Sequence, residues 1–88
     1  MVSKEVTLIN GQGMHMRPAK EFVNASLPFK SKVTIHFNDR DINGRSIMGI
    51  MAACMKKGSV LTISCEGPDE QANLDALVAL VESGLGEE

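Results

Sequence analysis

The order of hydrophobic periodicities along this 88-residue chain constrains its fold more than any other feature. Residues 5–8, 33–37 and 59–65 alternate polar and apolar side chains with the period of a half-buried strand. A turn cluster at 38–40 precedes a fourth, short candidate strand at 41–43. The candidate strands 33–37 and 41–43 are therefore predicted to pair as a hairpin.

Two further segments carry apolar residues at helical spacing, and residues 47–51 form a third, short helix-like run. The arrangement of Gly67, Pro68 and Glu70 predicts the N-cap and first turn of the last helix. The resulting order predicts an α+β two-layer sandwich, with helices on one face of an antiparallel sheet. The stripes of the two longer helices are Ala19, Phe22, Val23 and Leu27, and Leu74, Leu77, Val78 and Val81.

Length and composition exclude several classes of protein. Residues 1–88 suffice for one domain, which should bury about 60–70% of its unfolded surface. A net charge of −2 and only three aromatic residues, all Phe, give no surface suited to nucleic acid. The longest nearly apolar run, residues 47–55, is far shorter than the ~20 residues that span a bilayer, and no signal-peptide core is present. We therefore expect a cytoplasmic protein.

The two cysteines, Cys54 and Cys65, stand alone in apolar surroundings. Neither belongs to a Cys-x-x-Cys pair or lies at metal-ligand spacing from a histidine. We expect both to be buried thiols in a reducing compartment, and we expect no metal or cofactor.

Residues 13–19, Gly-Met-His-Met-Arg-Pro-Ala, predict an anion site at the start of a helix. Gly13 permits a tight turn, and Pro18 suits a first helical turn, so a helix should begin near Met16. The free N–H groups of that turn and the Arg17 guanidinium would bind phosphate. The positive charge of Arg17 and of the helix N-terminus disfavours a protonated imidazole, so His15 should be neutral. A neutral histidine is a nucleophile that can hold a phosphoryl group covalently. The competing interpretation is an N-cap or solvent-facing loop histidine.

This motif resembles the active-site signature of the HPr family, the histidine phosphocarriers of the bacterial sugar phosphotransferase system. Residues 43–51 are similar to that family's regulatory serine segment, and Gly58 and residues 66–72 also match, so the resemblance covers essentially the whole chain. It implies a four-stranded antiparallel sheet under three helices. It also implies a carrier, not an enzyme: His15 accepts a phosphoryl group from phospho-Enzyme I and passes it to IIA domains of sugar permeases. Arg17 and the backbone N–H groups of Met16 and Arg17 would bind the phosphate.

Ser46 precedes the short helix-like run, where a serine caps the helix by accepting from a free N–H. Within the resemblance it matches the site modified by HPr kinase/phosphorylase, which would support carbon catabolite regulation. Ile47, Met48 and Met51 would then form a docking patch for Enzyme I, IIA domains, that kinase and a catabolite-control transcription regulator. A carrier that visits several partners through one face should be a monomer.

The chain departs from the family at Met16, where Ala or Thr is usual, and at Gln12, which places the transfer rate in question. The carboxylate of Glu87 or Glu88 is a candidate to position the Arg17 side chain. His36 has no supporting neighbours in sequence and is expected on the solvent face of its strand. Two alternatives remain: a regulatory paralogue that acts mainly through Ser46 phosphorylation and transcription-factor binding, and a small-ligand module with His15 as a metal or anion ligand.

Overall fold

The computed structural model describes residues 1–9, 13–14 and 16–85, and this part of the chain forms four strands and three helices. The strands and helices alternate in the order that the periodicity predicts. Their bounds are β1 Val2–Thr7, α1 Met16–Ser26, β2 Lys32–Phe37, β3 Arg40–Asn43, α2 Ile47–Ala52, β4 Val60–Glu66 and α3 Glu70–Glu82.

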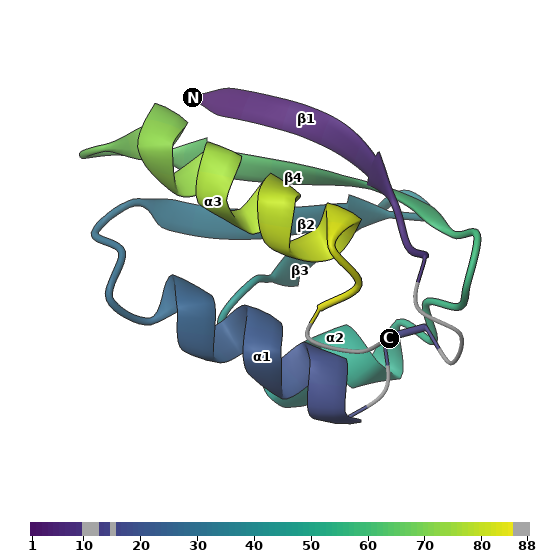
Figure 1. Ribbon diagram of the computed structural model, residues 1–88. Helices are drawn as coiled ribbons and strands as arrows, with labels where there is room; N and C mark the ends of the chain where they lie inside the picture. The colour runs from purple at the N-terminus through teal and green to yellow at the C-terminus, as the bar shows by residue number, and fades with distance from the viewer. Residues whose placement is uncertain (10–12, 15, 86–88) are drawn as a thin grey trace.

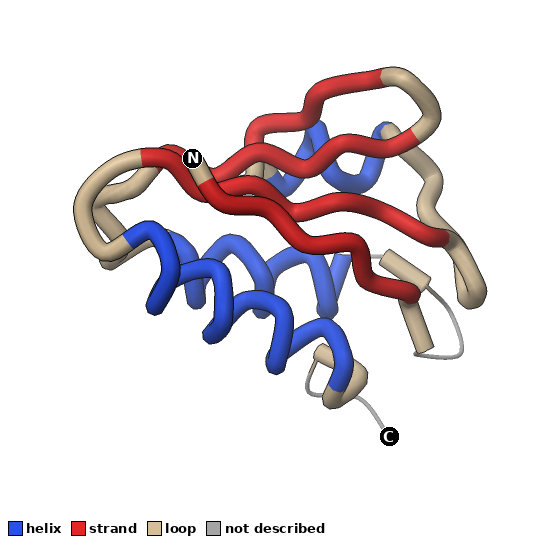
Figure 2. The backbone as a smooth tube through the Cα atoms, turned by 90° about the horizontal axis from the view of Figure 1, so that it is seen from above, coloured by secondary structure: helices blue, strands red, loops and turns tan. Residues whose placement is uncertain are grey.

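The four strands form one antiparallel sheet in the order β1-β4-β2-β3 (Figure 1). β2 and β3 pair as the predicted hairpin, with Ile35 opposite Ile42. The helices cover one face of the sheet and the other face is open (Figure 2). This arrangement confirms the α+β open-faced sandwich. Within the described ranges no helix is long and apolar enough to cross a membrane.

The core fills the space between the sheet and the helices. Alternate strand residues point into it, and the helical stripes of α1 and α3 close it from the other side. Each fully buried Leu, Ile or Phe side chain contributes about 1.5–3 kcal/mol to this packing. Its largest fully buried apolar side chains are Phe22, Leu8, Ile35, Ile50, Leu61, Ile63, Leu77 and Leu85.

Leu27 departs from the predicted stripe of α1. The helix ends at Ser26, whose hydroxyl donates to the Val23 carbonyl oxygen at 2.8 Å. Leu27 therefore lies past the last helical residue, and 58% of it is exposed. The prediction that it packs in the core is wrong because the helical period stops one residue earlier.

The last helix also begins later than predicted. Its N-cap is Asp69, in a left-handed conformation with φ 58°, and the cap makes no side-chain hydrogen bond. Gly67 is not the cap, but its N–H donates to Glu70 Oε1 at 3.4 Å and its carbonyl oxygen accepts from the Glu70 N–H at 3.2 Å. Residues 67–70 thus form a turn that leads into the helix.

The two cysteines occupy different environments. Cys65 is buried in β4, and burial raises the pKa of its thiol. Cys54 is exposed just after α2, with φ 55°. The prediction of two buried thiols is therefore correct for Cys65 and wrong for Cys54, because α2 ends at Ala52 and does not carry its buried face as far as residue 54.

Candidate functional site

A tight turn at Gly13 and Met14 leads into the first helix. Gly13 has φ 67°, and a Cβ there would lie 2.5 Å from both the Met55 carbonyl oxygen and Lys56 Cα. The Met14 N–H donates to that same Met55 carbonyl oxygen at 2.8 Å. The chain between α2 and β4 therefore supports the backbone that comes immediately before residue 15, and only glycine fits this approach.

Helix α1 begins at Met16, as predicted. His15 lies outside the described residues, as do Gln12, Glu87 and Glu88. Pro18 and Ala19 are buried and fix the first turn against the core. Arg17 is exposed and pairs with none of the described residues. Met16 is 63% exposed, so its large apolar side chain faces solvent beside this turn.

Ser46 caps the second helix in the way that the sequence predicts. Its backbone is extended, with φ −108° and ψ 108°, and its Oγ accepts from the Gly49 N–H at 3.0 Å. The side chain is half-buried. A helix-capping role for Ser46 is thus confirmed, and such caps stabilise a helix by about 1 kcal/mol.

The surface of α2 combines one buried and several exposed side chains. Met48 is 83% exposed and Ile50 is fully buried, while Ile47 and Met51 are half-buried. α2 packs beside α1 (Figure 1). Met55 is 2% exposed and belongs to the core.

Arg45 has a structural role that sequence reasoning missed. Its Nε donates to the Ser26 carbonyl oxygen at 3.1 Å, and its Nη2 donates to those of Phe29 and Ser31 at 2.6 and 2.7 Å. The guanidinium therefore ties the segment before Ser46 to the end of α1 and the following loop. No local pattern signals this contact, because its partners are backbone atoms 14 to 19 residues away.

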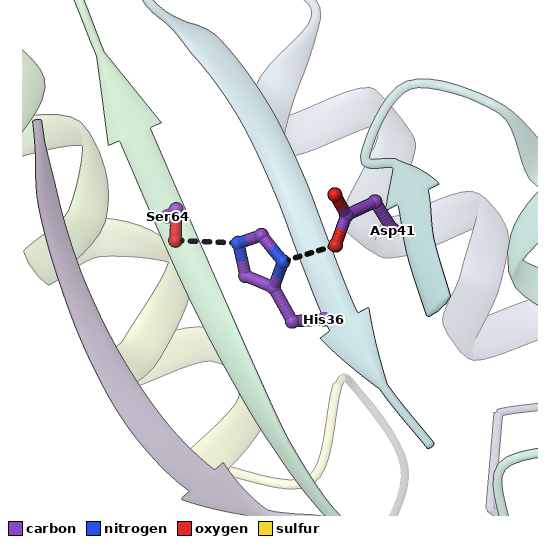
Figure 3. Close-up of polar contacts among 3 residues, drawn as sticks. All are labelled: His36, Asp41 and Ser64. Carbon is purple, nitrogen blue, oxygen red and sulfur yellow. Dashed lines mark hydrogen bonds and ion pairs between the residues drawn. The ribbon is translucent and has the colours of Figure 1, made fainter. Parts of the chain in front are cut away.

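His36 has partners that its sequence neighbourhood does not reveal. Its Nδ1 lies 2.6 Å from Asp41 Oδ1, and its Nε2 lies 2.8 Å from Ser64 Oγ (Figure 3). It is on the outer face of the sheet, as predicted, but it is hydrogen-bonded at both ring nitrogens. In the described part of the chain no cluster of three or more His, Cys, Asp or Glu residues is suited to hold a metal ion.

Comparison with known proteins places the turn and helix in a family. The family model described as "PTS HPr component phosphorylation site" matches residues 2–83. Phosphocarrier protein HPr of Treponema pallidum is 41% identical over 88 residues, which cover 100% of both chains. The HPr-like protein Crh of Halalkalibacterium halodurans is 38% identical over 82 residues, covering 93% of this chain and 98% of its own.

A solved structure gives the same assignment. The crystal structure of HPr-C-His from Thermoanaerobacter tengcongensis superposes with a TM-score of 0.95 at 39% identity, covering 100% of this chain and 99% of that one. Sequence and fold agree over nearly the whole length. The chain belongs to the HPr family, the phosphoryl-carrier proteins of the phosphotransferase system, which carry the group and are not enzymes.

Proposed function

We propose that His15 carries a phosphoryl group between proteins of a bacterial sugar phosphotransferase system. It takes the group from phospho-Enzyme I and passes it to the IIA domains of sugar permeases. Residues 1–88 act as one HPr-like domain, in the cytoplasm and as a monomer. Family membership supports the general role, and the arrangement of residues on either side of His15 supports this site.

The observation that carries the proposal is that the described residues on either side of His15 in the sequence form a constrained turn and the first turn of a helix. Gly13 holds the turn against Met55, and the helix begins at Met16. The first N–H groups of a helix have no partner within it, and they attract anions. Exposed Arg17 adds a positive charge two residues from the imidazole.

An exposed site suits a carrier better than a deep one. Met16 and Arg17 are both exposed, so a phosphoryl group bound beside them would stay open to the next nucleophile. The backbone N–H groups of Met16 and Arg17 and the Arg17 guanidinium would stabilise its negative charge. Transfer can then proceed in either direction.

The test is intact-mass spectrometry after incubation with phosphoenolpyruvate, magnesium and a bacterial Enzyme I. We expect one phosphoryl group on the wild type, lost on brief acid treatment, and none on His15→Ala. A known carrier labelled in parallel shows that Enzyme I is active. A label that survives on His15→Ala, or absence of label on both while the control is labelled, would refute the proposal.

Arg17 is tested separately. Arg17→Ala should slow phosphoryl transfer by about 10- to 100-fold, because charge-assisted hydrogen bonds are worth about 1.5–3 kcal/mol. The melting temperature should not change, because the side chain is exposed. Lys20→Ala is the matched control: it removes an exposed positive charge one turn further along α1. Equal rates for the two variants would remove Arg17 from the site.

Regulation at Ser46 is the second part of the proposal. HPr kinase/phosphorylase would modify Ser46, and a catabolite-control transcription regulator would bind the product. The half-buried Oγ is engaged with the Gly49 N–H, so the kinase must draw it away from its cap. A phosphate at a helix N-terminus is compatible with the helix dipole, so the fold should persist and the surface charge should change.

Ile47, Met48 and Met51 belong to the helix that this serine caps, and they form the proposed docking patch for Enzyme I and IIA domains. Met side chains adapt to differently shaped partners. A negative charge in the patch should repel an acidic partner, so Ser46→Asp should slow transfer from Enzyme I, and salt should partly restore it. Ser3→Asp, at an exposed position of β1, is the control. No change in rate for Ser46→Asp would leave Ser46 as a helix cap.

A regulatory paralogue is the alternative function. The similarity to an HPr-like protein Crh is the observation in its favour. Such a protein would act through Ser46 phosphorylation and carry little phosphoryl flux. The His15 labelling experiment separates the two functions, since only a carrier accepts a phosphoryl group from Enzyme I.

A further inference from the structure

Three polar side chains from three strands meet on the open face of the sheet. His36 of β2 lies between Asp41 of β3 and Ser64 of β4, at 2.6 and 2.8 Å (Figure 3). His36 is directly opposite Asp41 in the β2–β3 register. Ser64 is opposite Thr34, two residues before His36 on the same face of β2, so the imidazole reaches it diagonally. This cluster is not on the face that the helices cover and is separate from the proposed phosphoryl site.

The hydrogen-bond pattern fixes the roles of the two ring nitrogens. An ionised carboxylate can only accept, so His36 Nδ1 carries a hydrogen and donates it to Asp41. In the neutral imidazole the other nitrogen, Nε2, then has a free lone pair, which accepts the hydroxyl hydrogen of Ser64. This is the tautomer in which a histidine serves as a general base for a serine, with an acid residue orienting the ring.

The cluster opens into a hollow on the same face. The hollow has a volume of about 600 Å³ and is lined by the three cluster residues together with Lys32 and Asn43, among others. Volumes of this size are typical of small-molecule sites. Ser64 is only 3% exposed, while the His36 side chain is 38% exposed. A reagent must therefore be small and must reach the hydroxyl through the hollow.

One part of a hydrolase is missing. Ser64 lies in an inner strand, opposite Ser3 on one side and Thr34 on the other, so its own N–H belongs to the sheet ladder. It cannot serve as the backbone donor that stabilises a tetrahedral oxyanion in serine hydrolases. Losing such a donor typically costs about 10²–10³ in rate. The cluster is therefore suited to a single slow acyl transfer and not to rapid turnover.

We propose that Ser64 is a nucleophile that accepts an acyl group from small activated esters, with His36 as its general base and Asp41 as the residue that positions His36. Ser64 Oγ forms a bond to the carbonyl carbon of the ester while its proton passes to His36 Nε2. The bond between that carbon and the leaving oxygen breaks, and the leaving group takes the proton from His36. The products are O-acyl-Ser64 and the free alcohol or phenol.

The test uses p-nitrophenyl acetate as the acyl donor. The protein is incubated with the ester, and acetylation is located and timed by mass spectrometry of its peptides. We expect one acetyl group on Ser64 of the wild type, formed at least tenfold faster than on any other serine or threonine. General-base catalysis commonly contributes about 10²–10⁴-fold. An advantage of Ser64 below tenfold would therefore mean that His36 does not act as a base.

Variants separate chemistry from structure. Ser64→Ala should abolish the adduct. His36→Gln can still donate and accept hydrogen bonds but cannot take up a proton, so acetylation of Ser64 should fall at least tenfold. Asp41→Asn should slow the reaction, and Asp41→Glu should restore part of the rate, a rescue that a purely structural role would not require. Thr62→Val is the matched control, because Thr62 is on the same face of β4 and its loss should change nothing.

Thermal unfolding followed by circular dichroism shows which variants remain folded, and only folded variants enter the comparison of rates. Because His36→Gln preserves the shape and polarity of the bridge, a folded variant is available even if Ser64→Ala is not. Three results would overturn the proposal: no acetyl group on Ser64 of the wild type, acetylation of Ser64 less than tenfold faster than of any other serine or threonine, or a His36→Gln protein that reacts as fast as the wild type.

Discussion

Gly13→Ala should destabilise the protein more than Gly58→Ala, although both glycines have a positive φ. At φ 67° an alanine is in the left-handed region, which costs about 1–2 kcal/mol. Its Cβ would also lie 2.5 Å from the Met55 carbonyl oxygen and from Lys56 Cα, both backbone atoms that cannot rotate away. Relieving an overpacked contact of this kind costs about 1–3 kcal/mol. The expected loss in the free energy of unfolding is about 2–5 kcal/mol.

Gly58→Ala is the matched control. Gly58 has φ 89°, but a Cβ there would meet nothing within 4 Å. This variant carries the conformational cost alone, about 1–2 kcal/mol. Both substitutions restrict the unfolded chain equally, so that contribution cancels in the difference between them. The difference measures the close approach of Gly13 to the loop after α2.

The assay is urea denaturation followed by far-ultraviolet circular dichroism, because the chain has no Trp or Tyr for fluorescence. A second measurement is the rate at which each variant accepts a phosphoryl group from Enzyme I. Displacing Met55 would disturb its bond to the Met14 N–H, so Gly13→Ala should slow acceptance even under conditions where it is fully folded. If the two variants lose the same free energy to within about 0.5 kcal/mol, the difference lies within the expected error of comparing independent sites and the steric argument is wrong.

Three further predictions concern stability. Arg45→Met should lower the free energy of unfolding by about 2–3 kcal/mol in urea titrations, since it removes three charge-assisted bonds to carbonyl oxygens; Arg45→Lys should recover less than half of the loss, because an ammonium cannot reproduce the fork. Ser46→Ala should cost about 1 kcal/mol and Ser46→Asp much less, because a carboxylate can also accept the cap bond; equal losses would contradict the capping role. The terminal ammonium of Met1, and then the Gly67 N–H, lower the pKa of Glu70 below its ordinary 4.5. The stabilisation that the ionised Glu70 carboxylate contributes is therefore fully present above its ordinary pKa and is lost as pH falls through the lowered pKa. Glu70→Gln should then flatten the acid limb of the plot of stability against pH, measured by circular dichroism.

The predictions that succeeded rest on local rules. The alternation in β2 and β4 gave the buried face of the sheet, and Gly13 with Pro18 gave the start of α1 at Met16. The cap at Ser46 followed from the residue type and its position before an apolar run. Each of these depends on interactions within a few residues, so the sequence pattern carries the information directly.

The failures arose where an element ended or where distant segments met. Leu27 and Cys54 each lie one or two residues past a helix end, and end positions depend on the packing of the next segment. The last helix begins later than predicted, because the turn at Gly67 and the left-handed backbone of Asp69 come before it. Periodicity alone does not show where a helix stops.

The sequence by itself determined the order of strands and helices, the side of each that faces the core, and the motif that identifies the HPr family. Those features follow from side-chain periodicity and from the backbone preferences of glycine, proline and serine. Only the tertiary structure decided how the β2–β3 hairpin, β1 and β4 pair with one another, and in which register. That register brings Ser64 to His36, 28 residues away, and the fold brings Met55 to Met14. Such contacts depend on how separate elements pack together. No local pattern specifies them, because the same alternation of polar and apolar side chains is compatible with other registers.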